Sequence, residues 1–479
     1  MNNRARILLT MTLAVIIIVD GRAFLYRQSA AGKPGTEKLA SLLLANSFRE
    51  AERLAAQLLA APALDAPDMA VCGLAVLKAG RILEAEAIFK KVLLRSPDEP
   101  DAHLGLGRIA FIRNDLETSV SHLRRAVPTA FFYDEALRHL WRASLDRGRV
   151  DDLFETAKLA EERFARSSKP LPSFFTNGLA QVEGLAGKPL FRMEGRFERI
   201  RVPLVTSEQH RRTRMISLAL NRRGDYLFHI DSALAGFMTL SPLLAEELGL
   251  VPTGSAASTG VGTAPIATRF AVLDTVGLGP VTFGNVPVMV SDIRTLRGMK
   301  KGLIGTAFLK RFNTTIDVEA GTMDLFPLDR PDLLARNIDQ AAVAADVPLH
   351  IFEQTVVEAS VAGAPAALYI LDSAAATNLV DTGFFEEHIQ PKIDPAHIVQ
   401  AGIQGAGGAQ NVRRVDGLSI SLGPLVLEDQ QVNEFRMGGL NEISGRYAAG
   451  LLGNPLLWPY RVHMNFRAGR LILERYPRS

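Results

Sequence analysis

Residues 226–233 read YLFHIDSA, a hydrophobic run that ends in Asp-Ser-Ala, and the chain contains this pattern twice. The second copy reads LYILDSA at residues 368–374. Each copy is followed downstream by another apolar run that ends in glycine, GLIG at 302–305 and GLLG at 450–453. Short apolar runs of this kind are typical of buried strands. Each copy therefore places one carboxylate at the end of a predicted buried strand.

The two copies stay in register beyond the second glycine. Four positions match at a constant shift of 148 residues: Gly305, Asp317, Gly321 and Leu325 correspond to Gly453, Asn465, Gly469 and Leu473. This register predicts that the C-terminal half is a duplicated β unit. Two carboxylates from two related lobes, Asp231 and Asp372, indicate an acid/base pair at a pseudo-twofold axis.

These segments resemble the retropepsin-like aspartic proteases, in particular the bacterial proteins that carry two such units in one chain. The family motif, Asp-Thr/Ser-Gly after an apolar run, continues into a strand and a short helix. Residues 234–250, LAGFMTLSPLLAEELGL, match this continuation closely, and residues 375–381, AATNLVD, match it more loosely. The resemblance covers about residues 196–475. It implies an all-β, duplicated acid-protease-like barrel pair, with antiparallel barrels at 196–328 and 345–475.

By this resemblance, Asp231 and Asp372 are the catalytic residues of an aspartic-type endopeptidase. Two carboxylates about 3 Å apart cannot both ionise, so the pair shares one proton. The ionised member takes a proton from water while the protonated member polarises the scissile carbonyl. The resemblance implies a peptide or protein substrate and neither a cofactor nor a metal.

The resemblance also assigns residues that support the two active-site loops. They are Ser232, Ala233, Ser373, Ala374, Gly305 and Gly453. The serine hydroxyls are expected to brace the loops against each other. Ala233 and Ala374 stand where the family has glycine, and a methyl group there is unfavourable if φ is positive or two backbones approach closely. The alternative function is therefore a catalytically silent protein of the cell envelope that binds peptides or acts as a scaffold.

Each copy also has a glycine-rich segment between its Asp and its downstream glycine run. The segments are GSAASTGVGT at 254–263 and GIQGAGGAQ at 402–410. Small residues permit tight turns and hinge motion, and the family places at this position a hairpin flap that closes over the substrate. The flap candidates are Gly260, Gly262, Gly405 and Gly407. A plain loop is the alternative interpretation.

The N-terminal half has helical periodicity over residues 36–168 and repeats every 34 residues. Each repeated phrase begins with a turn residue, and these are Asn46, Gly80, Asn114 and Gly148. A 34-residue period with a turn between two helices resembles the tetratricopeptide repeat. We expect an all-α helical-repeat solenoid. It would either bind a protein partner or peptide, or space the β lobes from a membrane.

Residues 1–30 combine a basic start with an apolar run from Ile7 to Val19. This run is shorter than the ~20 residues of a comfortable membrane span, and it fits a secretory signal peptide. An uncleaved membrane anchor is the second interpretation. Either one predicts an exported protein, periplasmic or attached to the inner membrane and facing the periplasm.

Composition excludes several other classes. A net charge of +3 is too small to indicate nucleic acid as a partner. The nine histidines lack the His-Glu-x-x-His spacing of a zinc hydrolase. The single cysteine, Cys72, cannot form an intrachain disulfide and is expected to be a small core residue. The basic cluster at residues 210–214 is expected to be a solvated strand edge.

Overall fold

A computed structural model describes residues 34–61, 64–167, 169–206, 214–258, 260–262 and 264–477. The signal or anchor segment at 1–30 and residues 210–213 of the basic cluster lie outside these ranges. Within them, no helix is long and apolar enough to cross a membrane. A helical N-terminal region is followed by β-rich, barrel-like sheets, so the chain is a multidomain protein.

The chain divides into two compact units. The helical unit contains the described residues up to Ala110, together with Glu117–Leu140 and Gly445–Tyr447. The β unit contains Phe111–Leu116, Trp141–Ser444 and the described residues from Ala448 onward.

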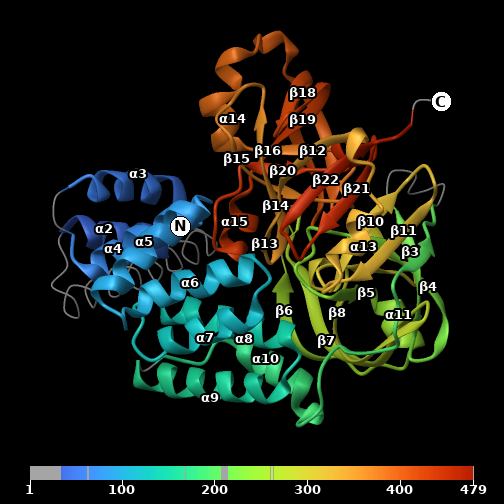
Figure 1. Cartoon of the computed structure of the whole chain (residues 1–479), viewed down its shortest axis with the longest axis horizontal. Coiled ribbons are helices and arrows are strands. Elements are labelled where there is room, and N and C mark those ends of the chain that lie inside the picture. Colours follow the sequence, from blue (N-terminus) through green and yellow to red (C-terminus); the bar gives the residue numbers. More distant parts are fainter. Residues whose placement is uncertain are drawn as a thin grey trace, which may run out of the picture. The chain divides into compact units, whose positions relative to one another are not determined.

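Among the described residues of the N-terminal region, the helices form four pairs (Figure 1). They are α2 Pro34–Leu44 with α3 Phe48–Leu59, α4 Ala66–Lys78 with α5 Ile82–Arg95, α6 Pro100–Ile112 with α7 Leu116–Ala126, and α8 Tyr133–Arg147 with α9 Val150–Arg166. The predicted turn residues lie between the two helices of successive pairs, with positive φ: 57° at Asn46, 95° at Gly80, 59° at Asn114 and 74° at Gly148. Glycine and asparagine adopt this left-handed conformation most readily. Cys72 is fully buried in α4.

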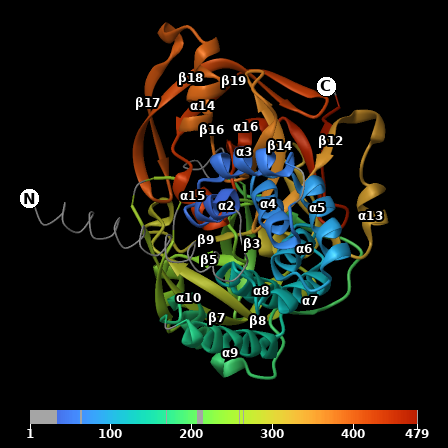
Figure 2. The ribbon, with the colours of Figure 1, turned by 90° about the vertical axis from the view of Figure 1, so that its left-hand side faces the viewer.

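Helix α10, Ser173–Val182, belongs to the β unit. The Gln181 side chain donates to the carbonyls of Ala271, at 2.8 Å, and Val288, at 3.1 Å. These carbonyls belong to β7 and β8, beside which α10 lies in Figure 2. Helix α10 is therefore packed against the first lobe.

The strands of lobe 1 form a ring. They are β1 Arg192–Glu194, β3 Met215–Leu220, β4 Arg223–Ile230, β5 Met238–Leu240, β6 Thr253–Ser258, β7 Ile266–Leu278, β8 Val281–Ser291 and β9 Gly302–Ile304. Pairing follows the order β3-β4-β9-β5-β8-β7 and returns to β3. The pairs β4–β9 and β5–β8 are parallel, and the other four are antiparallel.

The strands of lobe 2 follow the same order. They are β13 His350–Phe352, β14 Gln354–Val361, β15 Ala367–Leu371, β16 Asn378–Asp381, β17 Val399–Gly405, β18 Gly408–Leu422, β19 Leu425–Phe435 and β20 Gly450–Leu452. Pairing runs β14-β15-β20-β16-β19-β18 and returns to β14, with parallel pairs at the same two steps. The expectation of antiparallel barrels is therefore wrong for two of the six pairs in each ring. In each lobe a long connection separates the Asp-bearing strand, β4 or β15, from the short strand that pairs with it, β9 or β20. Because parallel strands need such a crossover connection, this path allows the two strands to run in the same direction.

A six-stranded antiparallel sheet contains strands of both lobes (Figure 1). Its order is β12 Val343–Pro348, β22 Arg470–Arg475, β21 Tyr460–Asn465, β10 Phe312–Asp317, β11 Thr322–Pro327 and β2 Ile200–Pro203. At its centre, Thr315 of β10 lies opposite His463 of β21. These two residues are related by the 148-residue shift, because 315 + 148 = 463. Two residues that the 148-residue shift relates are therefore paired with each other in this sheet.

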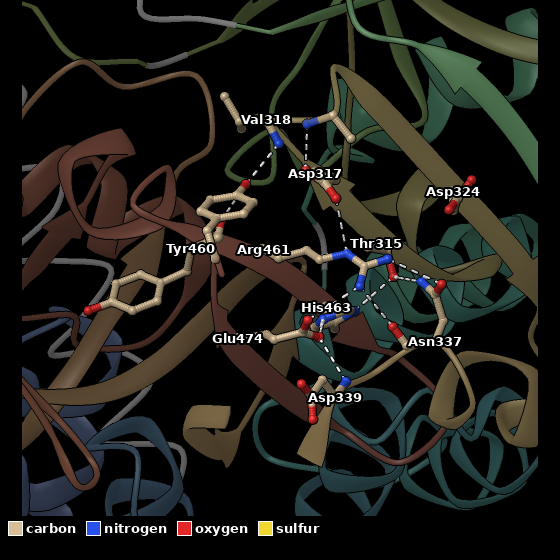
Figure 3. Close-up of polar contacts among 12 residues, drawn as sticks. Thr315, Asp317, Val318, Asp324, Asn337, Asp339, Tyr460, Arg461, His463 and Glu474 are labelled. Carbon is tan, nitrogen blue, oxygen red and sulfur yellow. Dashed lines mark hydrogen bonds and ion pairs between the residues drawn. The ribbon is translucent and has the colours of Figure 1, made fainter. Parts of the chain in front are cut away.

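A buried polar network surrounds this pair (Figure 3). His463 Nδ1 lies 2.8 Å from Thr315 Oγ1, and its Nε2 lies 2.9 Å from a carboxylate oxygen of Glu474. Arg461 pairs with Glu474 at 3.3 Å and with Asp317 at 3.2 Å. Burial lowers the pKa of His463 to about 4, so its imidazole is neutral at pH 7.

Candidate active site

The two candidate catalytic aspartates directly follow β4 and β15. The backbone N–H of Asp231 donates to the carbonyl of Ile304, at the end of β9, at 2.9 Å. The N–H of Asp372 donates to the carbonyl of Leu452, at the end of β20, also at 2.9 Å. Each aspartate thus adds one hydrogen bond to the parallel pairing of the strand before it. This bond fixes the position of the aspartate backbone at the end of the strand.

Each carboxylate is oriented by its own loop. Asp231 Oδ1 accepts hydrogen bonds from the N–H groups of Ala233 and Leu234, both at 2.9 Å. The same oxygen of Asp372 accepts from the two equivalent amides, at 2.8 and 3.0 Å. Short local bonds of this type hold an Asp side chain against its turn. Both carboxylates therefore have one defined orientation.

The two loops are joined by reciprocal serine hydrogen bonds. Ser232 Oγ donates to the carbonyl of Leu371 at 2.6 Å and accepts from the N–H of Ser373 at 3.0 Å. Ser373 Oγ donates to the carbonyl of Ile230 at 2.7 Å and accepts from the N–H of Ser232 at 3.1 Å. Both serines are fully buried. The structure thus brings Asp231 and Asp372 together as neighbours of one cross-linked pair of loops.

The two carboxyl groups interact electrostatically. Burial raises the pKa of each above the ordinary value for aspartic acid, and the negative charge of Asp372 raises the pKa of Asp231 further. The loop amides act in the opposite direction but do not cancel the effect of burial. A pair of this kind retains a proton at a pH where isolated aspartates are ionised.

Ala233 and Ala374 fit their loops without backbone strain. Neither residue has a positive φ. Ala233 packs against an apolar cluster that includes Ile370 and Leu451 of lobe 2. The conformational objection to alanine at these positions therefore does not apply to this chain.

Gly305 and Gly453 lie where two backbones approach closely. A Cβ atom on Gly305 would be 2.2 Å from the carbonyl oxygen of Gly236, and one on Gly453 would be 2.5 Å from that of Thr377. Both distances are far inside van der Waals contact. These glycines let α12 Thr306–Leu309 and α16 Asn454–Leu457 begin directly behind the two Asp loops.

Three supporting residues were missed from the sequence. Thr306 Oγ1 donates to the carbonyl of Ser232 at 2.8 Å. Thr355 Oγ1 lies 2.9 Å from the same carbonyl oxygen, and Gln354 Nε2 donates to the carbonyl of Ala233 at 2.9 Å. The signal available for Thr306 was its position directly after the repeated glycine.

The four flap candidates meet at the tips of two hairpins. Gly262 forms a parallel bridge with Gly407. The N–H of Gly407 donates to the carbonyl of Val261 at 2.8 Å. A Cβ on Gly405 would lie 2.5 Å from that same carbonyl oxygen, and one on Gly260 would lie 2.8 Å from Ala406 Cβ. The absence of side chains thus allows the tips to cross.

The crossed tips pack over the Asp loops. Val261 of the first hairpin and Ile403 of the second contact the same apolar cluster as Ala233 and Ala375. Among the described residues, no group of three or more His, Cys, Asp or Glu side chains is placed to hold a metal ion. The site thus combines two interacting carboxyl groups with two hairpins that pack against the same apolar cluster as the Asp loops.

A family model described as an aspartyl protease matches residues 216–308. Basic 7S globulin from soybean is similar at 11% identity and a TM-score of 0.35, covering 59% of this chain and 97% of that chain. Conglutin gamma, a basic 7S globulin from lupine seeds, is similar at 10% identity and a TM-score of 0.35, covering 59% and 96%. No curated protein matches. The family match spans Asp231, the first hairpin and Gly305, so this part of the chain is an aspartic-protease-like domain.

Proposed function

We propose that this chain is an aspartic-type endopeptidase in which Asp231 and Asp372 share one proton and activate water. The reciprocal hydrogen bonds of Ser232 and Ser373 carry the proposal, because they hold the two Asp loops together in the buried interior. The raised pKa of both carboxyl groups supports a shared proton. No cofactor is required by this chemistry.

The mechanism uses the two carboxyl groups in different protonation states. The ionised group acts as general base toward water, and the protonated group donates a hydrogen bond to the scissile carbonyl. The crossed hairpins would open to admit a peptide and close to exclude water. The glycines at their tips support this motion because they leave no side chains to interlock.

The same proposal covers the origin of the two lobes and the location of the chain. The matching strand order supports a duplicated retropepsin-like barrel pair, at residues 196–328 and 345–475. The 34-residue period and the left-handed turns support a tetratricopeptide-like array at residues 36–168. The pattern of residues 1–30 supports export to the periplasm, with or without attachment to the membrane. Cell fractionation tests the location. An alkaline wash of the membrane fraction should release a periplasmic protein and leave an anchored one in the membrane.

Asp231→Asn and Asp372→Asn test the dyad. An amide can neither act as base nor share the proton, so each change should reduce peptide cleavage by at least about 100-fold. Asp225→Asn is the matched control, because Asp225 is exposed on the same strand, β4, and should leave the rate unchanged. Retention of activity in either dyad variant would contradict the proposal. So would a parent protein that cleaves no peptide library between pH 3 and 7.

A catalytically silent peptide-binding protein is the second candidate. It rests on the departure from the family's glycine at Ala233 and Ala374, although neither alanine has a positive φ. The double variant Ala233→Gly plus Ala374→Gly separates the two functions. If parent and double variant both bind peptides and neither cleaves them, the chain is a binding protein. Cleavage restored by the double variant would identify the alanines as the cause of silence.

A further inference from the structure

Three residues far along the sequence belong to the helical unit. Gly445, Arg446 and Tyr447 follow α15 Gly438–Ser444 and lie three residues before β20. The corresponding connection in lobe 1 occupies residues 292–301, between β8 and β9, whereas this one occupies residues 436–449. The connection in lobe 2 is therefore four residues longer, and it contains the segment that the helices hold.

Backbone hydrogen bonds fix this segment on the helices. The Gly445 carbonyl accepts from Lys78 Nζ at 3.2 Å and from Arg108 Nη2 at 3.4 Å. The N–H of Tyr447 donates to the carbonyl of Lys78 at 2.8 Å. Lys78 is the last residue of α4, where helix carbonyls have no partner within the helix. The segment thus supplies a carbonyl acceptor for the side chains of Lys78 and Arg108. It also supplies an N–H donor for the last carbonyl of α4.

The side chain of Tyr447 adds to this recognition, and that of Arg446 is buried. Arg446 is fully buried and is among the largest fully buried side chains of the described residues. The guanidinium of Arg49 lies over the Tyr447 ring, 5.8 Å from its centroid, within the range of a cation–π interaction. Gly445 has a φ of 61°, a conformation that other residues adopt only with strain. Each of the three residues therefore has a distinct contact or conformational requirement.

The helical side of the site is a buried charge cluster. Lys78 and Arg108 both pair with Glu135, at 2.8 and 2.5 Å. The Lys78 and Arg108 side chains are 4% and 2% exposed. Two buried cations exceed the charge of one carboxylate, and a buried charge without sufficient partners is strongly unfavourable. The Gly445 carbonyl accepts from both cations and so adds an oxygen partner to this cluster.

We propose that the helical unit is a peptide-binding module and that its ligand is the chain's own Gly445-Arg446-Tyr447 segment. The module recognises a turn with a left-handed glycine, a buried arginine and an aromatic residue. This assigns the helices an internal ligand, in addition to any external partner. The assignment does not depend on peptide hydrolysis by the β unit.

A peptide added in trans tests the proposal in the full chain. Arg446→Ser plus Tyr447→Gly removes both side-chain anchors of the internal segment and leaves the charge cluster unchanged. A fluorescent peptide with the sequence of residues 443–449, ISGRYAA, should bind this variant saturably, and at least ten times more tightly than ISGSYAA does. The parent should not bind it, because its site is occupied. A folded variant that fails to bind, or a parent that binds equally well, would overturn the proposal.

Native proteolysis and hydrogen exchange of the parent give a second test that does not require the double variant to fold. Trypsin should not cut the Arg446–Tyr447 bond under conditions where it cuts after Arg336, whose side chain is 75% exposed. The Tyr447 amide should exchange at least ten times faster in Arg108→Met than in the parent. Arg95→Met, an exposed change in the same unit, should not alter it. Equal cleavage at both bonds, or an unchanged exchange rate in Arg108→Met, would contradict the proposal. Both readouts report binding, so they can fail while the endopeptidase proposal stands.

Discussion

Ser232 and Ser373 each contribute one hydroxyl donor and one hydroxyl acceptor to the cross-link between the Asp loops. Because both residues are fully buried, a missing hydroxyl removes a hydrogen-bond partner from a buried N–H group and from a buried carbonyl. The Leu371 carbonyl still accepts from Thr355 Oγ1, at 3.0 Å, when Ser232 loses its hydroxyl. Water cannot easily replace those bonds at such a site. The serines therefore matter for stability as well as for the position of the carboxyl groups.

Ser232→Ala and Ser373→Ala should each lower the free energy of unfolding by about 1–3 kcal/mol, the usual effect of unsatisfied buried polar groups. Ser232→Thr keeps the hydroxyl and should be closer to the parent. Urea unfolding measures the difference. Ser255→Ala, an exposed serine, is the control and should change stability by less than about 0.5 kcal/mol. A buried variant as stable as this control would show that the cross-link contributes little.

The dyad also predicts a pH dependence of stability. The folded-state pKa of Asp231 is raised, so its contribution to stability is present in acid and is lost as the pH rises above the ordinary value near 4. Asp231→Asn removes this ionisation. The variant should therefore be more stable than the parent at pH 7 and similar to it at pH 3.5. Denaturant unfolding at both values tests the sign, and Asp225→Asn should show no such gain.

At the scale of elements, α12 and β10 are joined by a turn that α8 holds in place. Lys310 Nζ pairs with the carboxylate of Asp146 at 2.5 Å, and both side chains are nearly fully buried. The Lys310 ammonium also lies 4.5 Å from the centroid of the Phe111 ring. Arg311 donates to the Asp146 carbonyl at 3.0 Å. All four residues belong to the β unit, and the turn lies one short helix away from Gly305.

Asp146→Asn and Lys310→Met should each destabilise the fold by about 3–5 kcal/mol, because each leaves a buried charge without its partner. Asp146→Leu plus Lys310→Met removes both charges and should be less destabilising than the sum of the single changes. A double-mutant cycle by denaturant unfolding measures the coupling. Additive effects would show that the pair is not energetically coupled.

The repeated local motifs could be predicted from the sequence, whereas the contacts between distant elements could not. The Asp-Ser-Ala copies, the downstream glycines and the turns at Asn46 and Gly80 follow from local chemistry and spacing. Thr355 could not be found this way, because it comes from lobe 2 to contact the loop of lobe 1, and that contact exists only after folding. The parallel strand pairs were missed for the same reason, since pairing direction depends on the path of the chain.

For the molecule as a whole, the shared six-stranded sheet places a neutral histidine in a buried charged network. His463 is opposite Thr315 in this sheet and faces Glu474, Arg461 and Asp317. Its folded-state pKa of about 4 is below the ordinary value of 6.5. The unfolded chain therefore binds a proton between these two values while the folded chain does not. Stability is lost as the pH falls from 6.5 toward 4, which includes the acidic range expected for the proposed dyad.

The parent should lose about 2 kcal/mol of stability through His463 between pH 7 and pH 5, from a shift of this size. His463→Gln keeps a polar side chain but cannot be protonated, so its free energy of unfolding should fall less over this interval. Urea unfolding of both proteins at the two values measures the difference. His397→Gln is the control, because His397 is exposed and should leave the pH dependence unchanged. If parent and His463→Gln lose the same stability, the imidazole is protonated in the folded state and the neutral-histidine network is wrong. If the predicted difference appears, the buried histidine of the shared sheet sets the lower pH limit of stability, whereas ionisation of the carboxyl pair sets the upper pH limit of activity.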